Sequence, residues 1–213
     1  MTTKLSKQAF YDELARLLIA DGWTRLPDAS GLTSLFAKRV GDLVLSLGTS
    51  ESSRYRERVT ADFRLARHTF MTLGSPDAPR TRARVGRFLD AREREELLDA
   101  EYCRPGVLDA WWIARTREAA EAIAAAVRCA EPRFLGQVGL ADEVEQSTTH
   151  AEYVAKLSSI ASTPFEEGRT TNGPPAEWVD AAYDLVPAAN PKHRRAFAAN
   201  IAADAWRTYR LLR

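Results

Sequence analysis

The stretch that decides the fold is residues 22–65, GWTRLPDASGLTSLFAKRVGDLVLSLGTSESSRYRERVTADFRL. It contains three apolar runs, Leu32 to Val40, Leu43 to Leu47 and Val59 to Leu65. The last two runs alternate between apolar and polar or small residues, which is the period of a strand with one buried face. Gly41-Asp42, between the first two runs, is typical of a tight hairpin. The segment therefore predicts an antiparallel β-meander.

Helices are expected both before and after this meander in the sequence. Residues 5–20 carry an apolar stripe with helical spacing, and Gly22 is placed to end that helix. Residues 90–100 are charged and predict a short exposed helix. Thr116 is a good N-cap for a helix that continues to about Ala130. Helices that bury one stripe need a sheet face to cover, so we expect an α+β fold.

Two further strands complete a sheet of about five. We expect them at Arg84 to Leu89 and at Val107 to Ala114, where apolar residues return after loop-forming stretches.

The C-terminal third predicts an all-helical extension. A soft boundary near residues 138–148 divides the chain into an α+β sheet domain, 1–140, and a helical module, 141–213. Asn190-Pro191 should begin the final helix. Asp204 borders the apolar stripe of that helix, and we expect its carboxylate to face water; Trp178 and Trp206 should pack inside the module. The stripe comprises Phe197, Ile201, Ala205, Tyr209 and Leu212.

Composition narrows the classes of function. The 213-residue chain has a formal net charge of +1 and a pI near 7.8, so the whole protein is not a strongly basic nucleic-acid binder. Its two cysteines, Cys103 and Cys129, form no CxxC pair, and this fits a reducing cytoplasm without disulfides or structural zinc. The polar N-terminus and the lack of a roughly 20-residue apolar run predict a soluble protein with no membrane segment.

Familiar catalytic motifs are missing from the sequence. There is no GxxxxGK[ST], GxGxxG, GxSxG or HExxH element, so we expect no cofactor and no metal. A site assembled by the fold from scattered residues such as His68, Asp62 and Glu57 stays open, because catalytic groups are recognised by geometry rather than by sequence order.

An arginine-rich segment, residues 54–87, is the strongest local feature. It holds nine arginines against three acids, a local charge of +6. Arg54, Arg56 and Arg58 alternate, so on a strand they share a face, and Arg64 joins the solvent face of its own strand if Phe63 and Leu65 point inward. Such a row can grip phosphates or an acidic protein surface. The alternative is a solvated face that the acidic residues 93–101 balance.

Trp111-Trp112 is the second candidate. Neighbouring residues on a strand point to opposite faces, so one tryptophan should enter the core and the other should face a second layer, a groove or solvent. The exposed one would be an anchor for a partner protein; the alternative is that both pack internally.

The order of these elements resembles a bacterial family, domain-of-unknown-function family 4304, over about residues 8–130. The resemblance rests on an amphipathic first helix, several strand motifs and a late tryptophan pair. They are Gly22-Trp23, Phe36-Ala37-Lys38-Arg39, Leu45-Ser46-Leu47, Ala61-Asp62-Phe63-Arg64-Leu65, Arg84-Val85-Gly86 and Trp111-Trp112. Where the family often shows Gln-x-Ser, this chain has Gly48-Thr49-Ser50, and Arg64 replaces a small amide. The resemblance implies an α+β fold and no known reaction.

The sequence thus favours a non-catalytic protein-binding protein. Its most concrete form is a bacterial immunity or defence-associated protein that masks a partner enzyme, such as a toxin or effector, through Arg54, Arg56, Arg58, Arg64, Trp111 and Trp112. The alternative is a nucleic-acid-binding or nucleic-acid-processing protein that uses the arginine-rich segment. The sequence does not indicate an oligomeric state.

Overall fold

The computed structural model describes residues 4–26, 34–41, 43–51, 58–66, 82–98, 112–113, 115–137, 148–165, 173–186 and 191–212. Its elements, in chain order, are α1 (Lys7–Ala20), β1 (Thr24–Leu26), β2 (Ser34–Val40), β3 (Leu43–Glu51), β4 (Arg58–Ala66), β5 (Arg82–Arg84), the 3-10 helix η1 (Val85–Phe88), α2 (Ala91–Leu97), β6 (Trp112–Ile113), α3 (Arg117–Gln137), α5 (Thr148–Ala161), α6 (Ala176–Leu185) and α7 (Pro191–Leu212).

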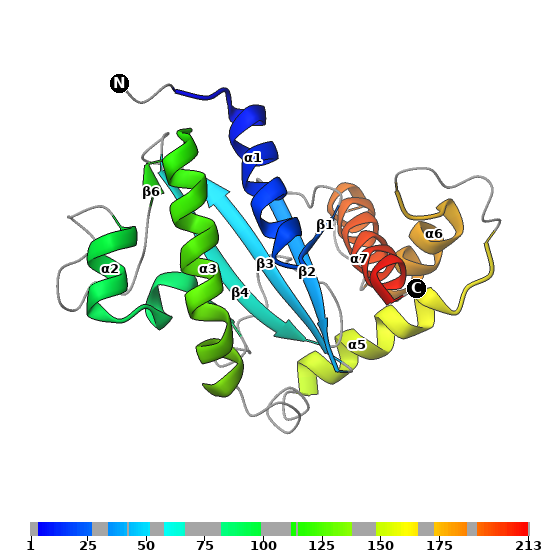
Figure 1. The fold of residues 1–213 in the computed structure, drawn as a ribbon. Helices are drawn as coiled ribbons and strands as arrows, with labels where there is room; N and C mark the ends of the chain where they lie inside the picture. The colour runs from blue at the N-terminus through cyan, green and yellow to red at the C-terminus, as the bar shows by residue number, and fades with distance from the viewer. Residues whose placement is uncertain are drawn as a thin grey trace.

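The strands form one antiparallel sheet in the order β1-β2-β3-β4-β5, and β6 also pairs with β4. Val40 lies opposite Leu43, which leaves a two-residue turn, and Gly41 adopts a φ of +60° there. This confirms the hairpin, since glycine reaches positive φ without a steric penalty. The predicted α+β fold with a helical C-terminal region is confirmed (Figure 1).

Helices α1 and α3 lie across one face of the sheet, here called the first face (Figure 1). Ser6 caps α1 by accepting a hydrogen bond from the backbone N–H of Ala9 at 3.2 Å. Gly22 follows the helix with a φ of +84°. Phe63 of β4 stacks on Phe134 of α3, with ring centroids 5.2 Å apart, so the first face and its helices share one core.

Two predicted boundaries are wrong. The chain is a strand only as far as Arg84 and then turns into η1, which buries Val85 and Phe88 in the core. Within the predicted strand Val107 to Ala114, the structure describes only residues 112–113, and both lie in β6. Helix α3 runs past Pro132 to residue 137, because burial of Phe134 offsets the hydrogen bond that the proline cannot donate.

The C-terminal helices α5, α6 and α7 bury a cluster of their own. Trp178 and Trp206 pack inside it, as predicted, and the ring centroids of the aromatic group lie 5.4–5.7 Å apart. This group comprises Phe165, Trp178, Trp206 and Tyr209. The proposed division at residue 140 falls outside the described residues and stays a prediction.

Helix α7 joins this module to the second face of the sheet. Leu211 packs against a small apolar cluster formed by Leu26, Leu35, Ala37 and Val44. Since α1 and α3 cover the first face, the β1–β2 end of the sheet is enclosed from both sides.

Two predictions about α7 are wrong. Phe197 is 58% exposed, because Ala198 and Ile201 face the module instead. Asp204 is only 1% exposed rather than turned to water, because its carboxylate accepts a hydrogen bond from the guanidinium of Arg207 at 2.8 Å. A buried carboxylate of this kind is tolerated only when it is paired.

Candidate functional site

The predicted arginine row is only partly within the described residues. Arg54 and Arg56 lie outside them. Arg58 and Arg64 share the second face of the sheet, as their spacing predicts, but Arg64 is 4% exposed, so its expected place in solvent is wrong. Alternation of residue types assigns side chains to the two faces of a strand, but it does not show whether either face is exposed to solvent. Strand β4 is buried on both faces from Val59 to Leu65.

Asp62 lies in the same buried region and is engaged in an ion pair. Its carboxylate is 3.0 Å from the guanidinium of Arg84, which also donates to the hydroxyl of Thr60 at 3.1 Å. The other members of the scattered catalytic set, His68 and Glu57, lie outside the described residues. The ion pair gives Asp62 a structural role on the second face.

Trp112 is the tryptophan of the pair that enters the core. It is 3% exposed, and its indole N–H donates to the backbone carbonyl of Leu97 at 2.8 Å. Trp112 therefore does not serve as a surface anchor, and Trp111 lies outside the described residues.

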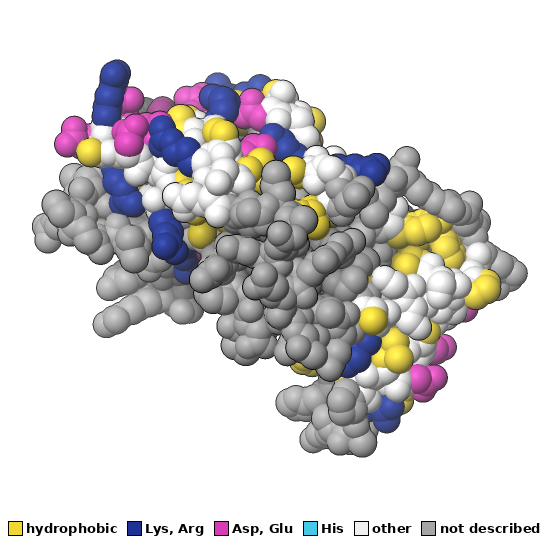
Figure 2. Space-filling view, turned by 90° about the horizontal axis from the view of Figure 1, so that it is seen from below, with side chains coloured by type: hydrophobic (Ala, Val, Ile, Leu, Met, Phe, Trp, Pro, Cys, Tyr) yellow, Lys and Arg dark blue, Asp and Glu magenta, His cyan; other side chains and the backbone are white. Residues whose placement is uncertain are grey.

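Elsewhere on the surface, charges of both signs are mixed. Figure 2 shows Lys and Arg side chains interspersed with acidic ones at the upper left, on the side where α1, α2 and α3 lie in Figure 1. Arg16 pairs with Glu13 and Arg128 with Asp21 in this region. These helices present the balanced surface of an ordinary solvated face.

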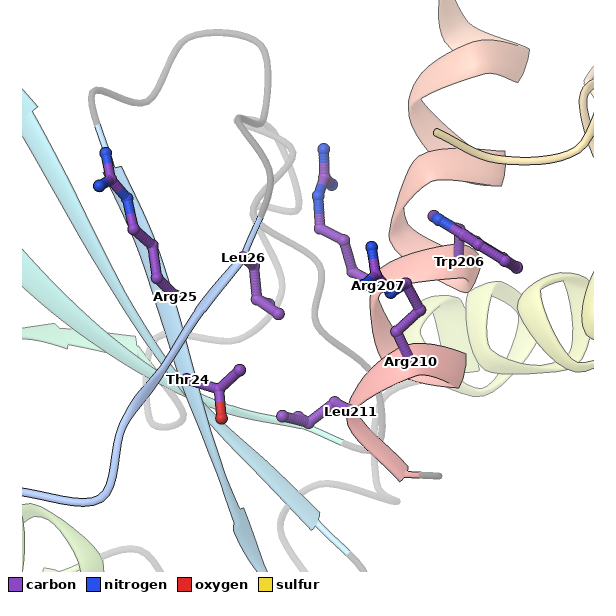
Figure 3. Close-up of a pocket in the computed structure, with 7 residues that line it drawn as sticks. All are labelled: Thr24, Arg25, Leu26, Trp206, Arg207, Arg210 and Leu211. Carbon is purple, nitrogen blue, oxygen red and sulfur yellow. The ribbon is translucent and has the colours of Figure 1, made fainter. Parts of the chain in front are cut away.

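The structure instead brings together a site that the sequence did not indicate, here called the β1–α7 pocket. It is a cavity of about 420 Å³ between the edge strand of the sheet and the C-terminal helix. Thr24 and Leu26 project from β1 toward α7, and Leu211 projects back toward β1 (Figure 3). The described residues that line it are Thr24, Arg25, Leu26, Trp206, Arg207, Arg210 and Leu211.

The four α7 residues share one side of the helix. Trp206 and Arg210 are four positions apart, as are Arg207 and Leu211, so each pair lies one above the other. Leu211 anchors this side to the sheet, and the polar members are held beside β1. The packing of α7 on the second face therefore creates the pocket.

The arginines of the pocket differ in how their charges are balanced. Arg207 is paired with Asp204, and both are buried. Arg25 directs its guanidinium away from α7 (Figure 3) and lies 2.8 Å from the carboxylate of Asp12. This hydrogen bond lowers the pKa of Asp12 and keeps it ionised. Arg210 is exposed and has no ion pair among the described residues, so one positive charge of the pocket is left uncompensated.

Trp206 contributes a hydrogen-bond donor without an acceptor. The residue is 7% exposed, and its indole N–H is buried with no partner among the described residues. The indole nitrogen lies at the end of the ring nearer to β1 (Figure 3). Trp178, in the same aromatic group, donates its N–H to the carbonyl of Thr163 at 2.9 Å. The hydrogen-bonding capacity of the Trp206 N–H is thus unsatisfied within the described structure.

One sequence signal points to these residues. The segment Trp206-Arg207-Thr208-Tyr209-Arg210 puts two arginines, three positions apart, beside the aromatic stripe of the last helix. Strand β1, which faces this side of α7, lies about 180 positions earlier in the chain. Local residue spacing carries no information about a contact over such a sequence distance.

The described part of the chain gives little support for a metal site, a reactive thiol or a membrane-spanning helix. No group of three His, Cys, Asp or Glu side chains there could hold a metal ion. Burial raises the pKa of the Cys129 thiol, with help from the nearby Glu93 carboxylate, so this thiol stays protonated at neutral pH. No described helix has the length and apolar character needed to cross a membrane.

No protein-family model, curated protein or solved structure matches the chain. The resemblance to domain-of-unknown-function family 4304 therefore stays a prediction.

Proposed function

We propose that this protein is a non-catalytic binding protein and that its recognition site is the β1–α7 pocket, which binds an anionic group of a partner protein. The observation that carries the proposal is that one cavity holds both the buried indole N–H of Trp206 and the guanidinium of Arg210, neither of which has a partner among the described residues. A buried donor without an acceptor costs about 1–3 kcal/mol, which an anionic acceptor would recover.

Tryptophan and arginine are also the residues that most often dominate protein interfaces. A bacterial immunity or defence-associated protein that masks a toxin or effector is the concrete form of this function. We place it in the cytoplasm, in keeping with its two cysteines.

Acetate and inorganic phosphate are the simplest probes of the pocket. In a protein labelled with nitrogen-15, either anion should shift the indole N–H resonance of Trp206, which a Trp206→Phe variant identifies. The shift should disappear in Arg210→Ala and persist in Arg92→Ala, a control at an exposed arginine of α2. If neither anion moves the Trp206 resonance, or if both arginine variants respond like the unmodified protein, the proposal fails.

The nucleic-acid alternative ranks second. Of the arginine-rich segment, the described Arg64 is buried and Arg84 is paired with Asp62, so these two add little to an exposed phosphate-binding row. Binding of oligonucleotides that weakens steeply between low and physiological salt would restore it, and binding that is flat with salt would eliminate it.

A further inference from the structure

The β1–α7 pocket adjoins an edge of the sheet. Strand β1 ends the strand order, and β2 is the only described strand that pairs with it. In an antiparallel pair, every second residue directs its N–H and C=O away from the neighbour. An edge strand can therefore accept an extended peptide as an added strand, and the three residues of β1 offer roughly 10 Å of backbone.

The charge of the pocket fits a singly charged group. After the pairings of Arg207 with Asp204 and of Arg25 with Asp12, only Arg210 is unbalanced among the described residues. A carboxylate matches this single charge, whereas a phosphate carries about −1.5 to −2 at neutral pH. One carboxylate can accept two parallel N–H groups from an arginine fork and still accept the indole N–H of Trp206.

The floor of the pocket is apolar. Leu26 is 6% exposed, and Leu211 packs beside it in the cluster on the second face of the sheet. A ligand that places its carboxylate on Arg210 can set an apolar side chain over these two leucines, where burial of apolar surface contributes about 25 cal/mol per Å².

We infer that the occupant of the β1–α7 pocket is the C-terminal carboxylate of an extended protein segment with an apolar last residue. This inference rests on the proposed function and specifies its ligand. A terminal carboxylate belongs to the backbone itself, so pairing with β1 and binding to α7 can involve consecutive residues of one strand. An Asp or Glu carboxylate stands away from the backbone and does not bring these two contacts together.

A display library of random peptides with free C-termini tests the inference. Peptides are selected on the immobilised full-length protein and counter-selected on the Arg210→Ala variant, which changes an exposed side chain. The selected peptides are then synthesised with a free carboxylate and with a terminal amide. We expect an apolar last residue, and at least tenfold weaker binding both for the amide and for Arg210→Ala, with Arg92→Ala unchanged.

Selected peptides that bind equally well as amides overturn the inference, and so does a library in which nothing is enriched over Arg210→Ala. The acetate titration separates this failure from failure of the proposed function. If acetate shifts the Trp206 resonance while no terminal carboxylate is selected, the anion pocket stands and its occupant is not a peptide terminus. If neither acetate nor phosphate shifts the resonance, both proposals fall.

Discussion

Replacement of Asp204 by alanine should destabilise the protein far more than loss of an equally short ion pair on the surface. The carboxylate of Asp204 lies 2.8 Å from the guanidinium of Arg207, and their side chains are 2% and 7% exposed. Removing one partner of a buried pair leaves the other charge uncompensated in the interior, which costs about 3–5 kcal/mol. Because Arg207 lines the β1–α7 pocket, we expect the lower end, about 3 kcal/mol.

The matched control is Glu96→Ala. Glu96 also lies 2.8 Å from an arginine, Arg92, but these side chains are 56% and 85% exposed. Solvent screens such a pair, so its loss should leave the free energy of unfolding nearly unchanged. The two variants thus compare pairs of equal length that differ in burial.

Urea unfolding followed by far-ultraviolet circular dichroism measures both free energies. The double variant Asp204→Ala/Arg207→Ala should regain part of the loss, since it no longer buries an unpaired charge. If Asp204→Ala is as stable as Glu96→Ala, or if the double variant is less stable by the sum of both single losses, then the pair does not hold α7 as described.

Two further predictions concern the helices that cover the first face of the sheet and the residues beside them. Gly22→Ala should lower the free energy of unfolding by about 1–2 kcal/mol, because the φ of +84° at Gly22 is strained for any residue with a Cβ. Gly136→Ala, within α3 and with open space around it, should instead raise this free energy by roughly 0.5 kcal/mol. Equal effects of the two variants in a urea titration would contradict this. The guanidinium of Arg133, by hydrogen bonding, lowers the pKa of Glu93 below its ordinary value. The stabilisation by ionised Glu93 is therefore present above its unfolded-state pKa and lost as pH falls through the lower folded-state value. Glu93→Gln should lower stability most at about pH 7 and least at about pH 3, and a difference independent of pH would refute the assignment.

Local sequence patterns predicted the sheet well, because its strands and turns are specified by residues close to one another in the sequence. Alternation in residues 43–47 and 59–65, a glycine in a two-residue turn and a capped first helix each act over a few neighbouring positions. The boundaries failed where tertiary packing overrides such preferences. Phe134 is the clearest case, since its burial against Phe63 carries α3 beyond a proline.

The site was not predictable in the same way. Arg64 has the spacing of a solvent-facing residue, but a second layer on the sheet determines its burial, and the sequence of β4 does not encode that layer. In the sequence, Asp204 has the position of a surface acid. The structure shows that it is buried together with Arg207, which lies one helical turn later. The β1–α7 pocket depends on the docking of the last helix on the first strand, which no local pattern specifies.

The most direct test of the central claim is the indole N–H resonance of Trp206 during a titration with acetate. The described structure leaves this donor without a partner beside the unbalanced guanidinium of Arg210. We expect a saturable shift of this resonance that disappears in Arg210→Ala, while the resonance of Trp178, whose N–H is already bonded to Thr163, stays in place. A Trp206 resonance that does not move, or that moves no more than that of Trp178, contradicts the assignment of the β1–α7 pocket as an anion-binding site.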